Sequence, residues 1–326
     1  MPSYSGVWSL VAQMQSLKSG TWPPSLSGDL GILYGHHTGT SAARRGTQYI
    51  SISSTGNATD YVDLTDGYTS RPMGWGTATR GGIAGGVKGN DDSSAKTDRI
   101  EYHVMASSSH LTHFGDLSVA KSNGSGLSNG TRAVYSGGHT PTALNVMEYI
   151  TVASVGDVTD FGDLSTVSHL GSSASGTTRG MIHIGNSSPG QSSTLTMEYI
   201  TVGSTGNTTD FGDSTDTCNS GFQFNSSVRM VHGVGEYSGT NNILEYYTIT
   251  STGNATDFGD LTSVISQAIG TGNATRGVRF GGTAPGLVNV MDYITFGSAG
   301  NATDFGDLLA ATYDNAAASD CHGGLP

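Results

Sequence analysis

One segment of sixteen residues occurs six times in this sequence. In every copy a tyrosine is followed fourteen residues later by an aspartate, and the copies begin 53, 47, 50, 47 and 47 residues apart. The third copy reads YITVASVGDVTDFGDL, and we call this segment the repeat motif. The six copies open at Tyr49, Tyr102, Tyr149, Tyr199, Tyr246 and Tyr293. A constant unit with spacers of uneven length predicts a closed array of similar units.

The composition favours short strands joined by tight turns. Glycine contributes 49 of 326 residues, about twice its usual share. Charged residues are only 12% of the chain, which excludes a highly charged disordered protein. The formal net charge of −12 argues against a nucleic-acid partner and against docking on an anionic membrane.

Neither disulfides nor targeting segments are expected. Cys218 and Cys321 occupy non-equivalent places in their units, so we expect two free thiols. The first residues lack a basic segment followed by an apolar one, so we expect no secretory signal. No stretch approaches the roughly 18 apolar residues of a membrane-spanning helix.

The repeat motif itself predicts a β-hairpin. Residues 146–152 alternate in steps of two and are rich in β-branched and aromatic side chains, as expected of a strand. Residues 154–157 form a turn signal, and residues 159–164 form a second strand.

A further strand is predicted upstream of each hairpin, where an arginine is followed six residues later by a glycine. We expect this glycine-containing strand at the narrow centre of a radial array, because glycine allows close backbone approach. Three or four strands in roughly 48 residues match one propeller blade. We therefore predict an all-β fold, a six-bladed β-propeller over residues 30–326. Its terminal units must pair, and its variable arginine-to-tyrosine segments should share one face.

Repeated charges predict structural ion pairs. A carboxylate precedes the tyrosine in five copies, on the same face as buried aliphatic residues, and a buried carboxylate requires a partner. The repeated arginine can supply a bidentate one. The first unit has Leu30 and Gln48 at these two positions, so both charges are missing together. The predicted pairs are Arg80 with Glu101, Arg132 with Glu148, Arg179 with Glu198, Arg229 with Glu245, and Arg276 with Asp292, and ligand binding by them is the less favoured alternative.

Other polar clusters suggest turn chemistry more than catalysis. The paired hairpin aspartates, such as Asp160 and Asp163, could bind calcium, but hydrogen bonds to turn backbone explain them better. Glycoside hydrolysis by paired carboxylates is disfavoured because the pairs recur in the repeats. His103, His110 and His113 could be metal ligands, but an exposed, altered turn is favoured. We expect no catalytic residue, no cofactor and no metal.

Residues 1–29 lie outside the repeats and predict a short N-terminal helix. Ser9 is a candidate N-cap and Gly20 a candidate helix end. The helix is short enough to require docking on a propeller or another subunit. The candidate particle-docking residues are Trp8, Leu10, Val11, Met14, Leu17 and Trp22.

Two resemblances follow from these motifs. The order Arg, Gly-Gly, Glu-Tyr and Phe-Gly-Asp-Leu is similar to a kelch-type propeller repeat over residues 30–322. The repeat motif, with Ser5-Gly6-Val7-Trp8 near the start, also resembles virion proteins of marine tailed bacteriophages of the cyanophage type.

The second resemblance implies a non-enzymatic virion structural protein, a tail-fibre or attachment component. It would dock in the particle through residues 1–29 and display its propeller to a host glycan or another partner, with self-association as a further option. The alternatives are a propeller lectin or glycan-active enzyme, and a cellular kelch-like interaction scaffold.

Overall fold

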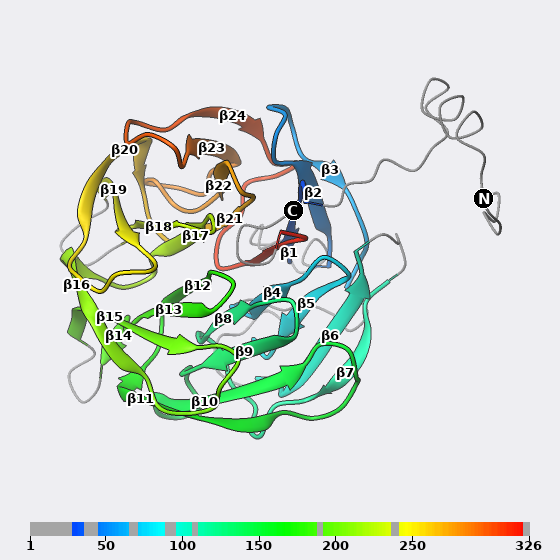
Figure 1. The fold of residues 1–326 in the computed structure, drawn as a ribbon. Helices are drawn as coiled ribbons and strands as arrows, with labels where there is room; N and C mark the ends of the chain where they lie inside the picture. The colour runs from blue at the N-terminus through cyan, green and yellow to red at the C-terminus, as the bar shows by residue number, and fades with distance from the viewer. Residues whose placement is uncertain are drawn as a thin grey trace, which may run out of the picture.

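The computed structural model forms a ring of six antiparallel β-sheets around a central axis, a six-bladed β-propeller (Figure 1). The structure describes residues 28–35, 45–64, 71–88, 96–105, 110–187, 192–235 and 241–321. These residues contain strands and no helix, so they include no helix that could cross a membrane. The predicted N-terminal helix and its docking residues Trp8, Leu10, Val11, Met14, Leu17 and Trp22 lie outside the described residues.

Each blade has four strands, which we name from the axis outward. Blade 1 contains β25 (Ala316–Ser319), β1 (Leu30–Tyr34), β2 (Thr47–Ser51) and β3 (Thr59–Asp60). Blade 2 contains β4 (Met73–Gly76), β5 (Arg80–Ala84), β6 (Arg99–Val104) and β7 (Thr112–Asp116). Blade 3 contains β8 (Ser125–Ser128), β9 (Arg132–Ser136), β10 (Leu144–Thr151) and β11 (Thr159–Ser168).

The second half of the ring repeats this plan. Blade 4 contains β12 (Ser172–Ser175), β13 (Arg179–His183), β15 (Ser192–Thr201) and β16 (Thr209–Cys218), with the short β14 (Asn186–Ser187) beside β15. Blade 5 contains β17 (Phe222–Asn225), β18 (Arg229–Gly233), β19 (Asn241–Thr248) and β20 (Thr256–Ile265). Blade 6 contains β21 (Ile269–Gly272), β22 (Arg276–Phe280), β23 (Val290–Thr295) and β24 (Thr303–Asp307).

The ring closes within blade 1, where strands from the two ends of the described chain meet. β25 pairs antiparallel with β1, placing Ile32 opposite Ala318. The Asp320 carboxylate accepts hydrogen bonds from the backbone N–H groups of Gly28 (2.8 Å) and Leu30 (2.9 Å). The prediction that the terminal units pair is confirmed.

The arginine-bearing strand is the second strand of the blade, so its predicted place at the centre is wrong. The innermost strands are shorter, and three of the six, β8, β12 and β25, are built largely from Gly, Ala and Ser, while β4 and β21 each contain two glycines. They contact one another around the axis. A Cβ atom at Gly126 would lie 2.4 Å from the Gly74 carbonyl oxygen, so crowding at the axis explains why these strands carry small residues.

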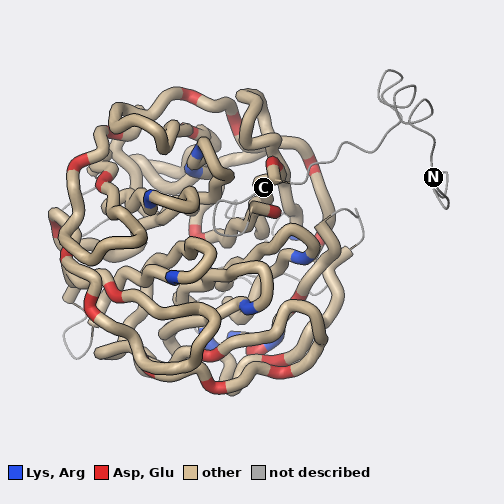
Figure 2. The backbone as a smooth tube through the Cα atoms, in the orientation of Figure 1, with Lys and Arg blue, Asp and Glu red and all other residues tan. Residues whose placement is uncertain are grey.

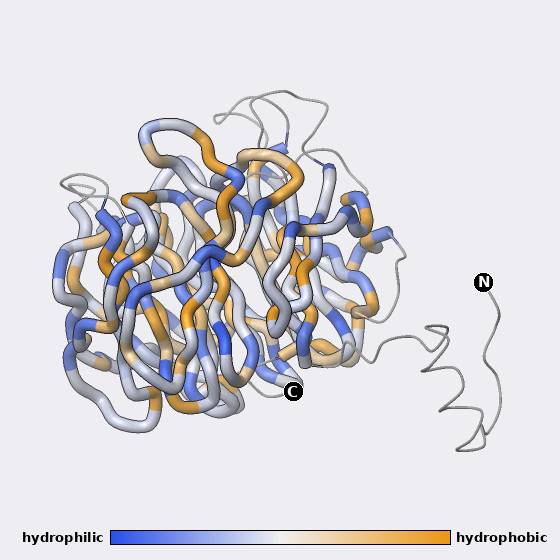
Figure 3. The backbone as a smooth tube through the Cα atoms, turned by 90° about the horizontal axis from the view of Figure 1, so that it is seen from above, coloured by the Kyte–Doolittle hydropathy of each residue, from blue (hydrophilic) through white to orange (hydrophobic). Residues whose placement is uncertain are grey.

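The hydrophobic cores lie between neighbouring blades. One core joins Val134, Met147 and Phe161 of blade 3 to Ile182 and Ile200 of blade 4. Figure 3 shows the ring edge-on, with hydrophobic and hydrophilic residues interspersed along the backbone. Each sheet is therefore buried on both faces by its neighbours, as expected in a closed ring.

The predicted hairpin is confirmed, and its turn also links adjacent blades. The backbone N–H of Gly206 donates to the Phe161 carbonyl oxygen (2.7 Å), and that of Thr208 donates to the Asp163 carbonyl oxygen (3.0 Å). The Asn207 side chain accepts from the Asp163 N–H (3.0 Å). Equivalent side-chain bonds join Asn57 to Asp307, Asp157 to Asp116, Asn254 to Asp213, and Asn301 to Asp260. The repeat motif thus holds each blade to the one before it.

Candidate functional site

The repeated arginines do not form the predicted pairs with the repeated carboxylates. In blade 3, Arg132 pairs with Thr151, whereas Glu148 pairs with Tyr135. Arg132 and Glu148 are therefore three residues, about 10 Å, apart along the strand direction. Each arginine instead lies over the tyrosine that opens its own repeat motif, with 4.4 to 4.9 Å from guanidinium carbon to ring centroid. Its Nη1 donates to a backbone carbonyl of the next blade. The five contacts are Arg80 to Val152, Arg132 to Val202, Arg179 to Ile249, Arg229 to Phe296, and Arg276 to Ser53.

The repeated carboxylates bind the blade before them. Glu148 accepts from the Ser118 N–H (3.2 Å), the Ser118 hydroxyl (2.5 Å) and the Lys121 ammonium (3.4 Å). Glu198 and Glu245 accept from the N–H and hydroxyl of Ser165 and Thr215, and Asp292 accepts from the Thr262 hydroxyl. The cations beside the carboxylates differ from blade to blade: Arg99 beside Glu101, Lys121 beside Glu148, His232 beside Glu245, and Arg279 beside Asp292. These contacts identify the carboxylates as connectors between blades.

The second-unit histidines are not gathered into one site. His103 is buried, with its Nε2 2.7 Å from the Tyr34 hydroxyl, and burial lowers the pKa of His103 to about 4. His110 is exposed and lies 3.3 Å from the Asp63 carbonyl oxygen, at the position that the turn asparagine has in other units. His113 pairs with Asp116 on the surface. The turn interpretation fits His110 and His113, whereas His103 is a core residue.

A closed ring of backbone hydrogen bonds surrounds one end of the central channel. One non-glycine residue in each blade has a positive φ, between 53° and 60°. The N–H of each donates to the carbonyl oxygen of the equivalent residue in the preceding blade, at 2.7 to 3.3 Å. The six residues are Arg71, Asn123, Leu170, Ser220, Gln267 and Asp314. We call this ring the mouth, because it encircles a cavity of about 120 Å³.

The mouth opens on the same face of the propeller as the variable segments. The innermost strands begin here, and because successive strands are antiparallel, the second strand of each blade ends here. The variable segment that follows therefore starts on this face. Isolated bridges of Ser122 with His139 and Ser266 with Thr283 place two such segments beside the crossings between blades. The expectation that these segments share a face agrees with this topology, and we call it the loop face.

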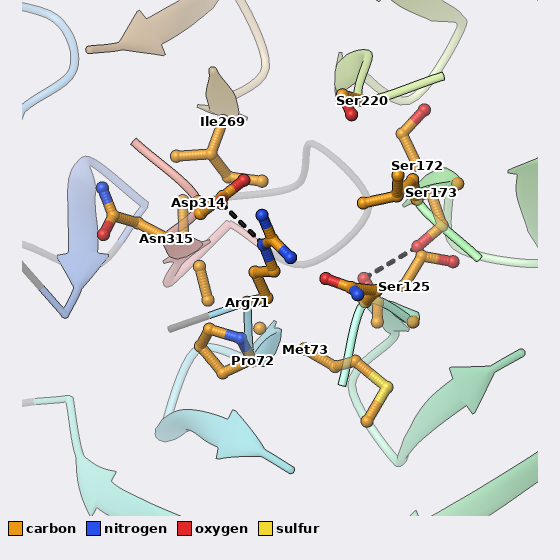
Figure 4. Close-up of a pocket in the computed structure, with 18 of the residues that line it drawn as sticks. Arg71, Pro72, Met73, Ser125, Ser172, Ser173, Ser220, Ile269, Asp314 and Asn315 are labelled. Atoms are coloured by element: carbon orange, nitrogen blue, oxygen red, sulfur yellow. Dashed lines mark hydrogen bonds and ion pairs between the residues drawn. The ribbon is translucent and has the colours of Figure 1, made fainter. Parts of the chain in front are cut away.

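The side chains at the mouth break the symmetry of the backbone. The Arg71 Nε donates to the Asp314 carboxylate at 2.7 Å, and Figure 4 shows this pair facing the wall that carries Ser125, Ser172 and Ser220. The Arg71 side chain is 26% exposed, so a ligand can reach it. Most other acidic residues lie toward the rim of the ring (Figure 2). The mouth therefore offers one accessible ion pair beside neutral polar groups.

Several buried polar atoms on the cavity wall have no hydrogen-bond partner in the described part of the chain. They are Asn123 Oδ1, Ser172 Oγ, Gln223 Oε1 and Asn315 Oδ1. An unsatisfied buried polar atom costs about 1–3 kcal/mol, which favours a bound polar ligand or ordered water.

A second polar cluster lies between blades 4 and 5, where His183, Cys218 and His232 are all buried. Both cysteines are free thiols, as predicted. Burial by itself would lower the pKa of His232, but the neighbouring Cys218 and Glu245 raise it to about 10. The two histidines were not singled out from the sequence. A possible signal was their occurrence on the second strands of consecutive units.

No family model matches the chain, and no curated protein matches it either.

Proposed function

We propose that this chain is a structural protein of a tailed-bacteriophage virion, a tail-fibre or other attachment component whose mouth binds a host surface glycan. The resemblance of the repeat motif to such virion proteins supports the setting. The observation that carries the binding role is the mouth, where an accessible ion pair and four unpartnered buried polar atoms surround one cavity.

A sugar suits this chemistry better than an apolar or strongly charged ligand. Hydroxyl groups both donate and accept, so they suit a wall that carries amide and hydroxyl side chains such as Asn123, Ser172 and Gln223. Arg71 and Asp314 add a charged donor and acceptor. The cavity volume equals about four liquid waters, so it accepts the edge of one sugar ring, with the rest lying across the loop face.

The carboxylates at the mouth fit glycan binding better than glycan hydrolysis. Glycoside hydrolysis ordinarily uses two carboxyl groups flanking the bond. Among the cavity-lining residues that the structure describes, Asp314 is the one carboxylate, and it is paired with Arg71. These features favour a lectin-like role over a glycan-active enzyme. The scaffold alternative draws support from the variable segments on the loop face, which suit a protein partner.

Glycan binding is tested with the purified full-length chain on a panel of host lipopolysaccharides and oligosaccharides. We expect Arg71→Gln and Asn123→Ala to weaken binding at least tenfold. The control Asp210→Asn, at an exposed site on β16, should leave binding unchanged. Circular dichroism would show that the variants fold. Absence of binding by the wild type, or equal binding by all variants, would refute the glycan role, and sugar release would favour the enzyme.

The virion setting has a separate test. Mass spectrometry and antibody labelling of purified particles should detect the chain, and deletion of residues 1–29 should abolish its incorporation. Incorporation of the truncated chain would disprove anchoring by this segment, and absence of the intact chain from particles would disprove the virion role.

A further inference from the structure

Three side chains with metal-binding atoms converge at the interface of blades 4 and 5. His183 is the last residue of β13, Cys218 is the last of β16, and His232 lies on β18. One nitrogen or sulfur atom from each lies within 4.8 Å of the others. His183 is 1% exposed, and Cys218 and His232 are fully buried.

Hydrogen bonds orient both imidazoles with Nε2 toward the centre of this cluster. His232 Nδ1 is 2.9 Å from the Glu245 carboxylate, which leaves Nε2 3.7 Å from Cys218 Sγ. His183 hydrogen-bonds the backbone of Thr194, while its buried Nε2 has no partner among the described residues. A metal-binding histidine has this arrangement, with one ring nitrogen held by an acceptor and the other directed at the ion.

Glu245 is itself held firmly. The Thr215 N–H and hydroxyl both donate to its Oε2 at 2.7 Å, and the Tyr247 hydroxyl lies 3.4 Å from its Oε1. A carboxylate fixed in this way keeps the attached imidazole in one orientation, the role that outer carboxylates have in zinc sites.

We propose that His183 Nε2, Cys218 Sγ and His232 Nε2 bind one zinc ion between blades 4 and 5. One thiolate and two imidazoles are a donor set that zinc favours. Tetrahedral zinc bonded to sulfur and nitrogen separates these two atoms by about 3.6 Å. The observed 3.7 Å between Cys218 and His232 matches that value, and a small shift of His183 completes the site. Water supplies the fourth ligand.

Comparison of the units shows that the scaffold does not need this cluster. The position of His183 holds Ala84 in blade 2 and Ser136 in blade 3, and the position of Cys218 holds Lys121 and Ile265 in blades 2 and 5. The two histidines and the cysteine come together at one interface within the described chain. Glycine at 221 also lets the backbone approach closely, since a Cβ there would lie 2.7 Å from His232 Nε2.

Zinc at this site would stabilise the mouth. Cys218 and Ser220 belong to the same crossing segment between blades 4 and 5, and Ser220 is a member of the backbone ring. A cross-link from Cys218 to His232 of the next blade would fix that crossing.

The test uses the full chain after treatment with a chelator, followed by titration with zinc or cobalt. We expect one equivalent to bind, a rise of several degrees in Tm, and, with cobalt, a thiolate charge-transfer band with the strong visible bands of tetrahedral coordination. Cys218→Ser should abolish the charge-transfer band and reduce the Tm shift. The control Cys321→Ser changes the other buried thiol and should retain both signals.

His183→Ser provides a second test that should preserve folding, because blade 3 has Ser136 at this position. We expect at least tenfold weaker zinc binding with little change in the Tm of the metal-free protein. No cobalt band in the wild type, or equal zinc affinity in Cys218→Ser and the wild type, would overturn the proposal and leave the cluster as a packing feature.

Discussion

The Tyr61 hydroxyl donates a hydrogen bond to the Met105 carbonyl oxygen (3.2 Å) across the interface of blades 1 and 2. At each of the other five interfaces, a repeated arginine donates to a carbonyl in the corresponding region of the next blade. Blade 1 has Leu30 in place of that arginine, and it has a tyrosine where most repeat motifs have phenylalanine. The first unit therefore keeps the inter-blade bond with a different side chain.

Removing the Tyr61 hydroxyl should destabilise the ring at this interface. We expect Tyr61→Phe to lower the free energy of unfolding by about 1 kcal/mol, because the Met105 carbonyl loses its donor. Arg132→Leu at the interface of blades 3 and 4 should cost a similar or larger amount, since it removes both a hydrogen bond and the stacking on Tyr149. Urea denaturation measures both, and an unchanged midpoint for Tyr61→Phe would contradict the assignment.

The turn asparagine should stabilise the contact between blades. Asn207→Ala removes the acceptor for the Asp163 N–H, and we expect a loss of about 1 kcal/mol in the free energy of unfolding. Asn207→Asp is the matched control, because Asp157 accepts from Asp116 in the equivalent place. Thermal denaturation should place the Asp variant near the wild type, and equal losses in both would refute a specific acceptor role.

Gly162 should not tolerate a side chain. Its φ is 140°, and a Cβ would lie 2.4 Å from the Gly206 carbonyl oxygen of the next blade. We expect Gly162→Ala to cost about 2–3 kcal/mol of stability. Gly203→Ala is the control, because a Cβ there meets no atom within 4 Å. Its Tm should be unchanged or slightly higher, and similar losses in both variants would contradict this explanation.

Buried His103 should make the protein less stable in acid. Its pKa of about 4 lies below the usual value of 6.5. Between those pH values the unfolded chain binds the proton and the folded chain does not, so stability falls as pH decreases from about 6.5 to 4, by up to about 3 kcal/mol.

The double variant Tyr34→Phe/His103→Ile removes this titration together with the hydroxyl that His103 accepts from. Isoleucine occurs at the equivalent position in the first, third, fourth and sixth copies. Urea unfolding from pH 7 to pH 4 should give a smaller loss of stability in the double variant. Parallel curves for the two proteins would contradict a role for His103.

The buried pair of Lys121 and Glu148 should be sensitive to the loss of one partner. The exposed fractions of the two side chains are 0% and 3%. Lys121→Met leaves the carboxylate without its cation, and we expect a loss of about 3 kcal/mol. Lys121→Met/Glu148→Gln should recover most of this stability, because Gln48 of blade 1, at the position equivalent to Glu148, accepts through its side-chain Oε1 from the Leu309 N–H (2.8 Å). No recovery in the double variant would refute this interpretation.

The periodic part of the fold was predictable from the sequence. Alternation within residues 146–152 and the following turn signal locate the hairpin, and the spacing of six copies gives the number of blades. The innermost strands were misassigned because segments such as Ala316–Ser319 are short and have little alternation. Their small residues reflect crowding at the axis, which depends on the closed ring.

The partners of the repeated charges were not predictable because they lie in neighbouring blades. Arg132 and Glu148 belong to one unit, but Val202 and Ser118, which they contact, belong to the units on either side. The simultaneous absence of both charges from unit 1 suggested a pair, although Tyr61 and Gln48 replace them independently.

The mouth has no sequence signature, because its backbone ring uses six different residue types. Of these, Asn123 and Asp314 are types that commonly adopt a positive φ, whereas Leu170 is not. The metal-binding atoms of His183, Cys218 and His232 come together only when blades 4 and 5 pack.

The pairing of β25 with β1 also has a consequence for how the chain matures. The first unit is made early during translation but lacks its axial strand until residues 316–319 leave the ribosome. Until then β1 exposes an unpaired edge, which is open to pairing with a neighbouring nascent chain. The final folding step therefore joins two strands that lie at opposite ends of the described sequence. Synthesis of many copies close together favours exchange of this strand between chains.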